Sequence, residues 1–304
     1  MIKEHLLSRY PSGFERTVAL REFIERICCR YIELRLADPN FERDLCFGND
    51  ARYWQRLSEA LLAHEFLEIG LDLRPSRNGP DLLIHHGGRN IWIEVICPEP
   101  VGIPMEWLQS KLDEVITLPH EAILLRWTAA IKEKAEKLLG NADKGIAGYI
   151  DKGVVGAEDS YVVAINGRLL RGQSCFASIT GISQWPFAVE AVFAVGPFAI
   201  QIDRRSLKAT GSGHQHRPII KKPNGASVPA DTFFDPRFRR VSAIFAVDFD
   251  GSHIIGNSKP TAVIHNPNAA IPVPPGLLPA DRDYVASEHG NDEYLLERRT
   301  GRLG

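Results

Sequence analysis

The stretch NGPDLLIHHGGRNIWIEVICPEP, residues 78–100, places two carboxylates, Asp81 and Glu94, in a segment whose apolar residues favour burial. Residues 81–86 and 90–97 are rich in β-forming residues, and Gly87-Gly88 between them is typical of a tight hairpin turn. A carboxylate among apolar residues costs several kcal/mol unless a cation or hydrogen bonds compensate it. The segment therefore predicts a β-hairpin that carries either a structural ion pair or a bound metal at Glu94.

Strand alternation predicts which side chains share a face of this hairpin. Glu94 falls on the same face as Trp92 and Ile96, and the residues between them take the other face. Twelve residues separate Asp81 from Glu94, so a turn near Gly87-Gly88 brings both carboxylates to the same end of neighbouring strands. Paired carboxylates with backbone carbonyls nearby suit a hard cation such as Mg²⁺ or Mn²⁺.

Composition excludes several classes of protein. The chain has 304 residues, 44% hydrophobic and 24% charged, which is ordinary for a globular protein with a substantial core. The formal net charge of −2 shows no global basicity, so a nucleic-acid site would have to be local. The five cysteines fit neither a disulfide framework nor zinc spacing. With no apolar run of membrane-spanning length and no secretory h-region, we expect a cytoplasmic protein.

The order of predicted elements indicates one α/β domain, residues 1–304, with no clear linker. Helices are expected at 17–37 and 50–70, the latter starting after Asn49 or Asp50, then a short helix within 105–116 and another at 129–139. Besides the hairpin, strands are expected at 122–128, 160–166, 187–203, 241–249 and 261–267. The Gly-, Pro- and Ser-rich residues 204–240 predict a long surface loop.

The motif GPD followed by IWIEVI resembles the PD-(D/E)xK nuclease superfamily, whose fold is that of restriction endonucleases. The family's order of helix, three-stranded meander, helix and strand matches the predicted elements within about 50–166, the nuclease-like core. The resemblance implies a mixed central sheet flanked by helices, and about 167–304 would form a β-rich C-terminal extension. It also implies metal-dependent hydrolysis of phosphodiester bonds, most of all in DNA, as in restriction or defence.

Carried onto this sequence, the resemblance makes Asp81 and Glu94 the ligands of a Mg²⁺ or Mn²⁺ ion. A Glu on the preceding helix often joins them in the family, and Glu59, which borders the apolar stripe of that helix, is the candidate. Glu65 is not excluded by the same pattern. The alternative for either residue is a helix carboxylate paired with a surface Arg.

The chain departs from the family where a Lys is expected two residues after the Glu, because Ile96 stands there. The family's Lys stabilises charge at the scissile phosphate, which an Ile cannot do. The following segment offers Arg126, Lys132, Lys134 and Lys137 as replacements, with Lys134 preferred and Lys132 second. These two lysines are two residues apart on a helix, so only one of them can face the site.

Residues 203–240 hold nine Lys or Arg against three acids and are the predicted grip on nucleic-acid phosphates. The alternative is an ordinary solvated loop. The candidate contacts are Arg204, Arg205, Lys208, Arg217, Lys221, Lys222, Arg239 and Arg240.

Two other classes of function remain open. Ile96 would suit a catalytically inactive nuclease fold that binds nucleic acid or a protein partner. Asp81 and Glu94 could instead form structural ion pairs with Arg126 or a Lys in a partner-regulated protein. If the chain is an endonuclease that cuts double-stranded DNA at specific sites, a homodimer is expected.

Overall fold

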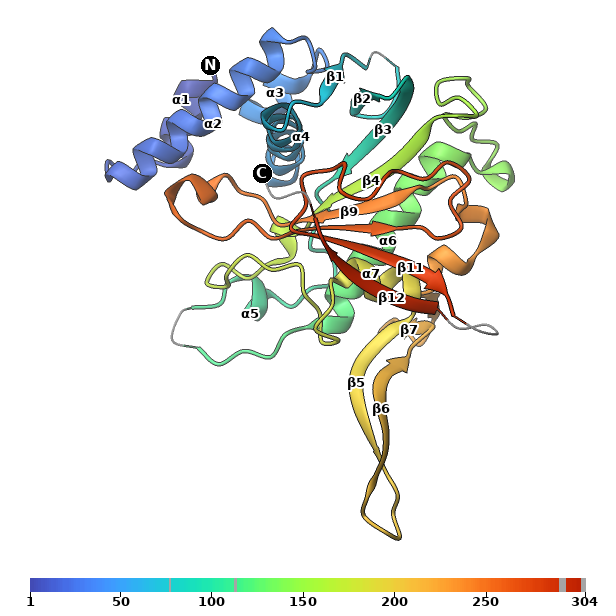
Figure 1. Ribbon diagram of the computed structural model, residues 1–304. Coiled ribbons are helices and arrows are strands. Elements are labelled where there is room, and N and C mark those ends of the chain that lie inside the picture. The colour runs from blue at the N-terminus through green and yellow to red at the C-terminus, as the bar shows by residue number, and fades with distance from the viewer. Residues whose placement is uncertain (77, 112–113, 290–293, 302–304) are drawn as a thin grey trace.

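The chain folds around one mixed eight-stranded sheet with helices on both faces (Figure 1). The computed structural model describes residues 1–76, 78–111, 114–289 and 294–301. The order across the sheet is β1-β2-β3-β4-β9-β10-β11-β12. Its strands are β1 (Asp72–Arg74), β2 (Leu82–His86), β3 (Arg89–Ile96), β4 (Ser160–Asn166), β9 (Ala243–Val247), β10 (Thr261–His265), β11 (Arg282–Glu288) and β12 (Tyr294–Thr300). This confirms the expected mixed α/β class with a central sheet flanked by helices.

Two sets of helices bury the two faces of the sheet. One face packs against α1 (Ile2–Arg9), α2 (Glu15–Glu33), α3 (Phe41–Phe47) and α4 (Asp50–Glu68). The other face packs against α6 (His120–Leu139) and α7 (Phe187–Phe193), and α5 (Met105–Leu108) is a single turn. The 3-10 turns are Ala142–Lys144, Gly167–Leu170, Thr232–Phe234, Pro236–Phe238 and Ser252–Ile255. None of the described helices is long and apolar enough to cross a membrane.

The part of the sheet that carries the candidate residues has the predicted order of helix, meander, helix and strand. After α4, the strands β1, β2 and β3 pair antiparallel, α6 crosses over the sheet, and β4 returns parallel to β3. Helix α4 begins as expected, because the Asn49 side chain accepts a hydrogen bond from the Arg52 N–H at 3.0 Å. The predicted helix at 17–37 is confirmed as α2, which ends earlier, at Glu33.

The hairpin of β2 and β3 has the predicted turn and register. Leu82 pairs with Ile93 and His86 with Arg89, so Asp81, one residue before β2, lies opposite Glu94. Trp92 and Ile96 join the core beneath α6, whereas Ile93 and Val95 join the core beneath α4. The predicted alternation of faces along β3 is therefore confirmed, and Glu94 points toward α6.

Gly88→Ala should lower the free energy of unfolding by about 1 kcal/mol, because φ at this residue is 77° and an L side chain disfavours the left-handed region. Urea denaturation measures the loss. Gly213→Ala is the control, since Gly213 is exposed on a strand with ordinary φ and open space around its Cβ position. Equal stability of the two variants would contradict the strained turn.

Two predicted strands are wrong because helical packing overrides local β propensity. Residues 122–128 lie in α6, where Leu124, Trp127 and Ile131 form one buried face at helical spacing. The predicted helix at 129–139 is the second half of the same helix. Within 187–203, the first seven residues form α7, and only β5 (Val195–Ile202) is a strand. Of the short helix expected within 105–116, α5 covers four residues, and 112–113 lie outside the described residues.

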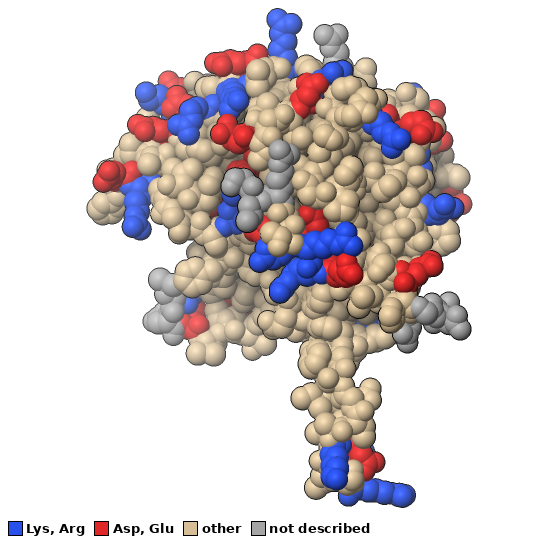
Figure 2. Space-filling view, in the orientation of Figure 1, with Lys and Arg blue, Asp and Glu red and all other residues tan. Residues whose placement is uncertain are grey.

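Residues 204–240 are not a long loop. Strand β5 pairs with β6 (Ala209–His216) in a hairpin that projects from the body of the protein (Figure 1), and β7 (Ile219–Lys221) pairs with β8 (Ser227–Pro229). Figure 2 shows a shaft without charged side chains and a cluster of charge at the far end of the projecting hairpin. Exposed Phe198, Ile200 and Ile202 follow one another at alternate positions along this shaft.

Candidate functional site

Glu94 is fully buried in β3, and its compensating charge comes from α6. Lys134 Nζ lies 3.0 Å and Lys137 Nζ 2.7 Å from Glu94 Oε1. The Tyr149 hydroxyl donates to Glu94 Oε2 at 3.3 Å. The Glu94 carboxylate works against desolvation to raise the pKa of Lys137 above its ordinary value. Two ion pairs to the crossover helix therefore compensate the cost of burying a Glu in this apolar strand.

The two lysines singled out by the sequence point in different directions, as their spacing requires. Lys134 is 5% exposed and joins the buried face of α6 between Ile131 and Leu138. Lys132 extends toward β8, with its Nζ 3.5 Å from the Pro229 carbonyl oxygen. The structure therefore brings Lys134, and not Lys132, to Glu94. It also brings Lys137, which is one turn further along the helix and was not preferred.

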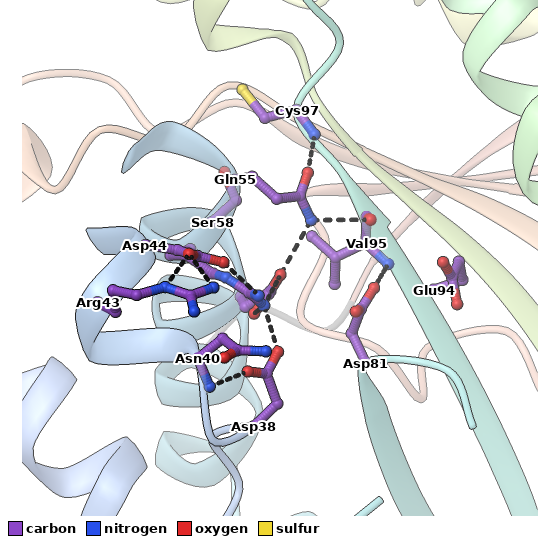
Figure 3. A network of polar contacts seen from close by, with 12 residues as sticks. Asp38, Asn40, Arg43, Asp44, Gln55, Ser58, Asp81, Glu94, Val95 and Cys97 are labelled. Carbon is purple, nitrogen blue, oxygen red and sulfur yellow. Dashed lines mark hydrogen bonds and ion pairs between the residues drawn. The ribbon is translucent and has the colours of Figure 1, made fainter. Parts of the chain in front are cut away.

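Asp81 lies beside Glu94 and is held by the neighbouring strand. Its Oδ2 accepts a hydrogen bond from the Val95 N–H at 2.7 Å, and Figure 3 shows the two carboxylates next to each other. Burial, the Glu94 carboxylate and the Glu59 carboxylate raise the pKa of Asp81 well above its ordinary value of 3.8, although Lys134 opposes them. The raised pKa of Asp81 means that a proton or a cation beside this carboxylate would be favoured.

Gln55 on α4 forms hydrogen bonds to the backbone at the end of β3, a role that the sequence did not predict. Its amide Nε2 donates to the Val95 carbonyl at 3.1 Å, and its Oε1 accepts from the Cys97 N–H at 2.9 Å. The same Nε2 lies 3.0 Å from Glu59 Oε1. The sequence does contain an indication of this role, because Gln55 is a polar residue one helical turn before Glu59, on the side of α4 that faces the sheet.

Glu59 is buried as expected, but its carboxylate already has cationic and amide partners. Arg56 Nη1 lies 3.3 Å from Oε1 and 3.1 Å from Oε2. Burial raises the pKa of Glu59, and Arg56 and Gln55 counteract it. Glu65 is ion-paired with Lys259 at 2.5 Å, away from this cluster. Within the described part of the chain, no three His, Cys, Asp or Glu side chains form a group that could hold a metal. The structure therefore does not assemble Glu59 with Asp81 and Glu94 as a three-carboxylate ligand set.

A hollow of about 600 Å³ lies at the end of β3, between α4 and α6. Its wall includes Gln55, Ile96 and Lys134, and Arg52 and Arg126 also line it. Ile96 and Lys134 thus face the same space. Lys134 of α6 therefore lies near Ile96, the residue that stands where PD-(D/E)xK nucleases have a Lys.

The basic residues of segment 203–240 separate into several places instead of forming one grip. Arg204, Arg205 and Lys208 lie at or near the tip of the β5–β6 hairpin. Arg217 is paired with Glu121 at 2.5 Å, and Arg240 donates to the carbonyls of Gly156 and Ala157. Arg239 is exposed near the 3-10 turn of residues 236–238. Lys221 and Lys222 line a different hollow, beside α6.

Comparisons of the chain with protein-family models, with curated proteins and with solved structures gave no significant match.

Asp81→Asn should change how stability depends on pH. The pKa of Asp81 is raised in the folded protein, so the folded state binds more protons than the unfolded state between the two pKa values. Wild-type stability relative to the variant should therefore fall as pH rises above about 4, and level off above the raised pKa. Urea denaturation from pH 4 to 9 measures this difference, with Asp143→Asn as the exposed-carboxylate control. A difference that is constant with pH would contradict the raised pKa.

Gln55→Ala should lower the free energy of unfolding by about 1–3 kcal/mol, because it leaves the Val95 carbonyl and the Cys97 N–H without their partner. Gln201→Ala, on the exposed β5–β6 hairpin, is the matched control. Chemical denaturation gives both values. If the Gln55 variant loses no more stability than the control, Gln55 does not fasten β3.

Proposed function

We propose that the chain is a metal-dependent nuclease that hydrolyses phosphodiester bonds, with DNA as the expected substrate. The observation that carries the proposal is the arrangement of Asp81, Glu94 and Lys134. Two carboxylates from neighbouring strands lie side by side, and the ammonium of Lys134 contacts one of them at the wall of an open hollow. These are the three chemical groups that the resemblance to PD-(D/E)xK nucleases requires, with the ammonium supplied by α6.

The order of elements supports the same proposal. A helix, an antiparallel three-stranded meander, a crossover helix and a strand parallel to β3 follow one another from α4 to β4. This is the order implied by the resemblance, and it supports the assignment of Asp81 and Glu94 as the proposed metal ligands. The projecting hairpin and the strands from β9 onward lie outside this unit.

The donor set fits one divalent cation better than a cluster of cations. Asp81 uses Oδ2 for the Val95 N–H, and among the described residues no hydrogen bond reaches its Oδ1. Glu94 Oε2 has only the hydroxyl of Tyr149, at 3.3 Å, as a hydrogen-bond partner among these residues. Asp81 and Glu94 would hold Mg²⁺ or Mn²⁺, which prefer such oxygen ligands, with water completing the coordination. Because the pKa of Asp81 is raised, a cation would compete with a proton for this carboxylate.

The chemistry divides between the cation and the protein's own groups. A bound divalent cation supplies positive charge to a phosphate and lowers the pKa of water. The ammonium of Lys134, which contacts Glu94 and belongs to a residue that lines the hollow, would stabilise charge that develops on a phosphate there. Lys137 also contacts Glu94 Oε1, so this carboxylate keeps a cationic partner while Lys134 acts on the substrate. Gln55 and the Val95 N–H hold the end of β3 and the Asp81 carboxylate in place.

A second candidate is a nuclease fold that binds nucleic acid or a protein partner without cutting. The observation in its favour is that Glu94 Oε1 already has two ammonium partners, which compensate the buried charge without any metal. In that case the three charged groups would be a structural ion cluster, and removal of the Glu94 charge would leave two lysines uncompensated.

The wild-type protein should cut DNA in the presence of Mg²⁺ or Mn²⁺, and Asp81→Asn and Glu94→Gln should abolish cutting because they remove the charges that hold the cation. Lys134→Ala should slow cleavage by about 100-fold, and Lys134→Arg should restore part of the rate. The assay uses supercoiled plasmid, linear duplex and single strands, with initial rates from gels.

Circular dichroism confirms that each variant is folded, and Lys152→Ala, an exposed lysine outside the site, is the matched control. If the folded wild type cuts no substrate with either metal, the nuclease proposal is wrong. Retained cleavage in the two carboxylate variants would place the active site elsewhere.

A further inference from the structure

A larger hollow, of about 830 Å³, adjoins the candidate site. It lies between α6 and the β7–β8 hairpin, and Val101 and Arg126 line both this hollow and the one at the end of β3. The contact of Lys132 Nζ with the Pro229 carbonyl joins its two walls at 3.5 Å. A ligand could therefore extend from Lys134 directly into this space.

The floor of this hollow is apolar and its rim is basic. Leu125 and Ala129 of α6 face Val228 and Pro229 of the hairpin. The rim carries Arg126, Lys132, Lys221 and Lys222 against a single acid, Glu121, which is paired with Arg217. Burial lowers the pKa of Lys132, and an anion bound nearby would oppose this shift by stabilising the ammonium form. In a chain of net charge −2, this is a local concentration of positive charge.

An apolar floor with cations around it has the chemistry of a site for unpaired nucleotides. Proteins that bind single strands combine a positive groove for phosphates with apolar or aromatic surfaces for the faces of the bases. In a duplex the base faces are covered by stacking and are not available to such a floor. Phosphates alone would need the basic rim but not the apolar surface between α6 and β8.

We propose that this hollow binds an unpaired strand of nucleic acid next to the cleavage site, with a base on the Leu125–Ala129 floor and phosphates at Lys132, Lys221 and Lys222. The inference rests on the proposed function in one respect, because it treats the bound strand as the substrate of the nuclease. Of the expected nucleic-acid contacts in residues 203–240, it keeps Lys221 and Lys222 of the β7–β8 hairpin and adds Lys132 of α6. It also predicts a substrate with a single-stranded part, such as a frayed end, a flap or a bubble.

The test is binding of fluorescein-labelled oligonucleotides in EDTA, followed by anisotropy, so that cleavage plays no part. The wild type should bind a single strand more tightly than the same sequence as a blunt duplex. Lys221→Ser with Lys222→Ser should weaken single-strand binding about tenfold at 0.1 M salt and flatten its salt dependence. Ala129→Trp fills the hollow from an exposed helix position without changing charge, and should weaken single-strand binding by a similar factor.

The matched controls are Arg204→Ser with Arg205→Ser at the tip of the projecting hairpin, and Ala142→Trp in an exposed turn. Controls that bind like the wild type support the proposal. Equal or tighter binding of blunt duplex, or no loss in the Lys221/Lys222 and Ala129 variants, would overturn it. If the wild type cuts nothing but these binding differences hold, the nuclease proposal fails while this site stands.

Discussion

The ion pair between Glu94 and the lysines of α6 is the interaction on which the site depends. A carboxylate with no exposed surface in the middle of a sheet is tolerated only with close compensation, and Lys134 and Lys137 supply it from the helix that crosses the sheet. Lys134 lies on the same buried face of α6 as Trp127 and Ile131, so the ion pair and the apolar packing of the helix support the same orientation.

The end of β3 is held from the opposite face of the sheet as well. Gln55 on α4 bonds the backbone on both sides of Ile96, and Asp81 accepts a hydrogen bond from the Val95 N–H. Ordered from two sides, this strand end forms the wall of the hollow that contains Lys134. Burial and the neighbouring carboxylates raise the pKa of Asp81, which supports the proposed cation site, and the basic rim beyond Arg126 supports the proposed binding of an anionic strand. The proposed sites for the cation and for the anionic strand are next to each other, because Val101 and Arg126 line both hollows.

The sequence predicted those features of the fold and the site that depend on residues close together in the chain. Gly87-Gly88 fixed the hairpin, strand alternation fixed the face of Glu94, and the turn placed Asp81 opposite it. Residues 122–128 were predicted as a strand because their apolar residues are consecutive, and only packing beneath the sheet shows that Leu124 and Trp127 continue the face of Ile131. Lys134 lies on that same face, which distinguishes it from Lys132 once the helix is recognised as one element. The roles of Gln55 and Lys137, the separation of the basic residues and the strands β11 and β12 depend on long-range contacts that one sequence does not reveal.

The most direct test of the central proposal is calorimetric titration of the protein with Mn²⁺ at neutral pH, in buffers of different ionisation enthalpy. The proposal predicts one bound ion per chain and tighter binding as pH rises, because a cation and a proton compete for Asp81, whose pKa is raised. Asp81→Asn should abolish this binding while the fold is retained. A folded wild-type protein that binds no Mn²⁺, or an Asp81→Asn variant that binds it equally well, would contradict a metal site at Asp81 and Glu94.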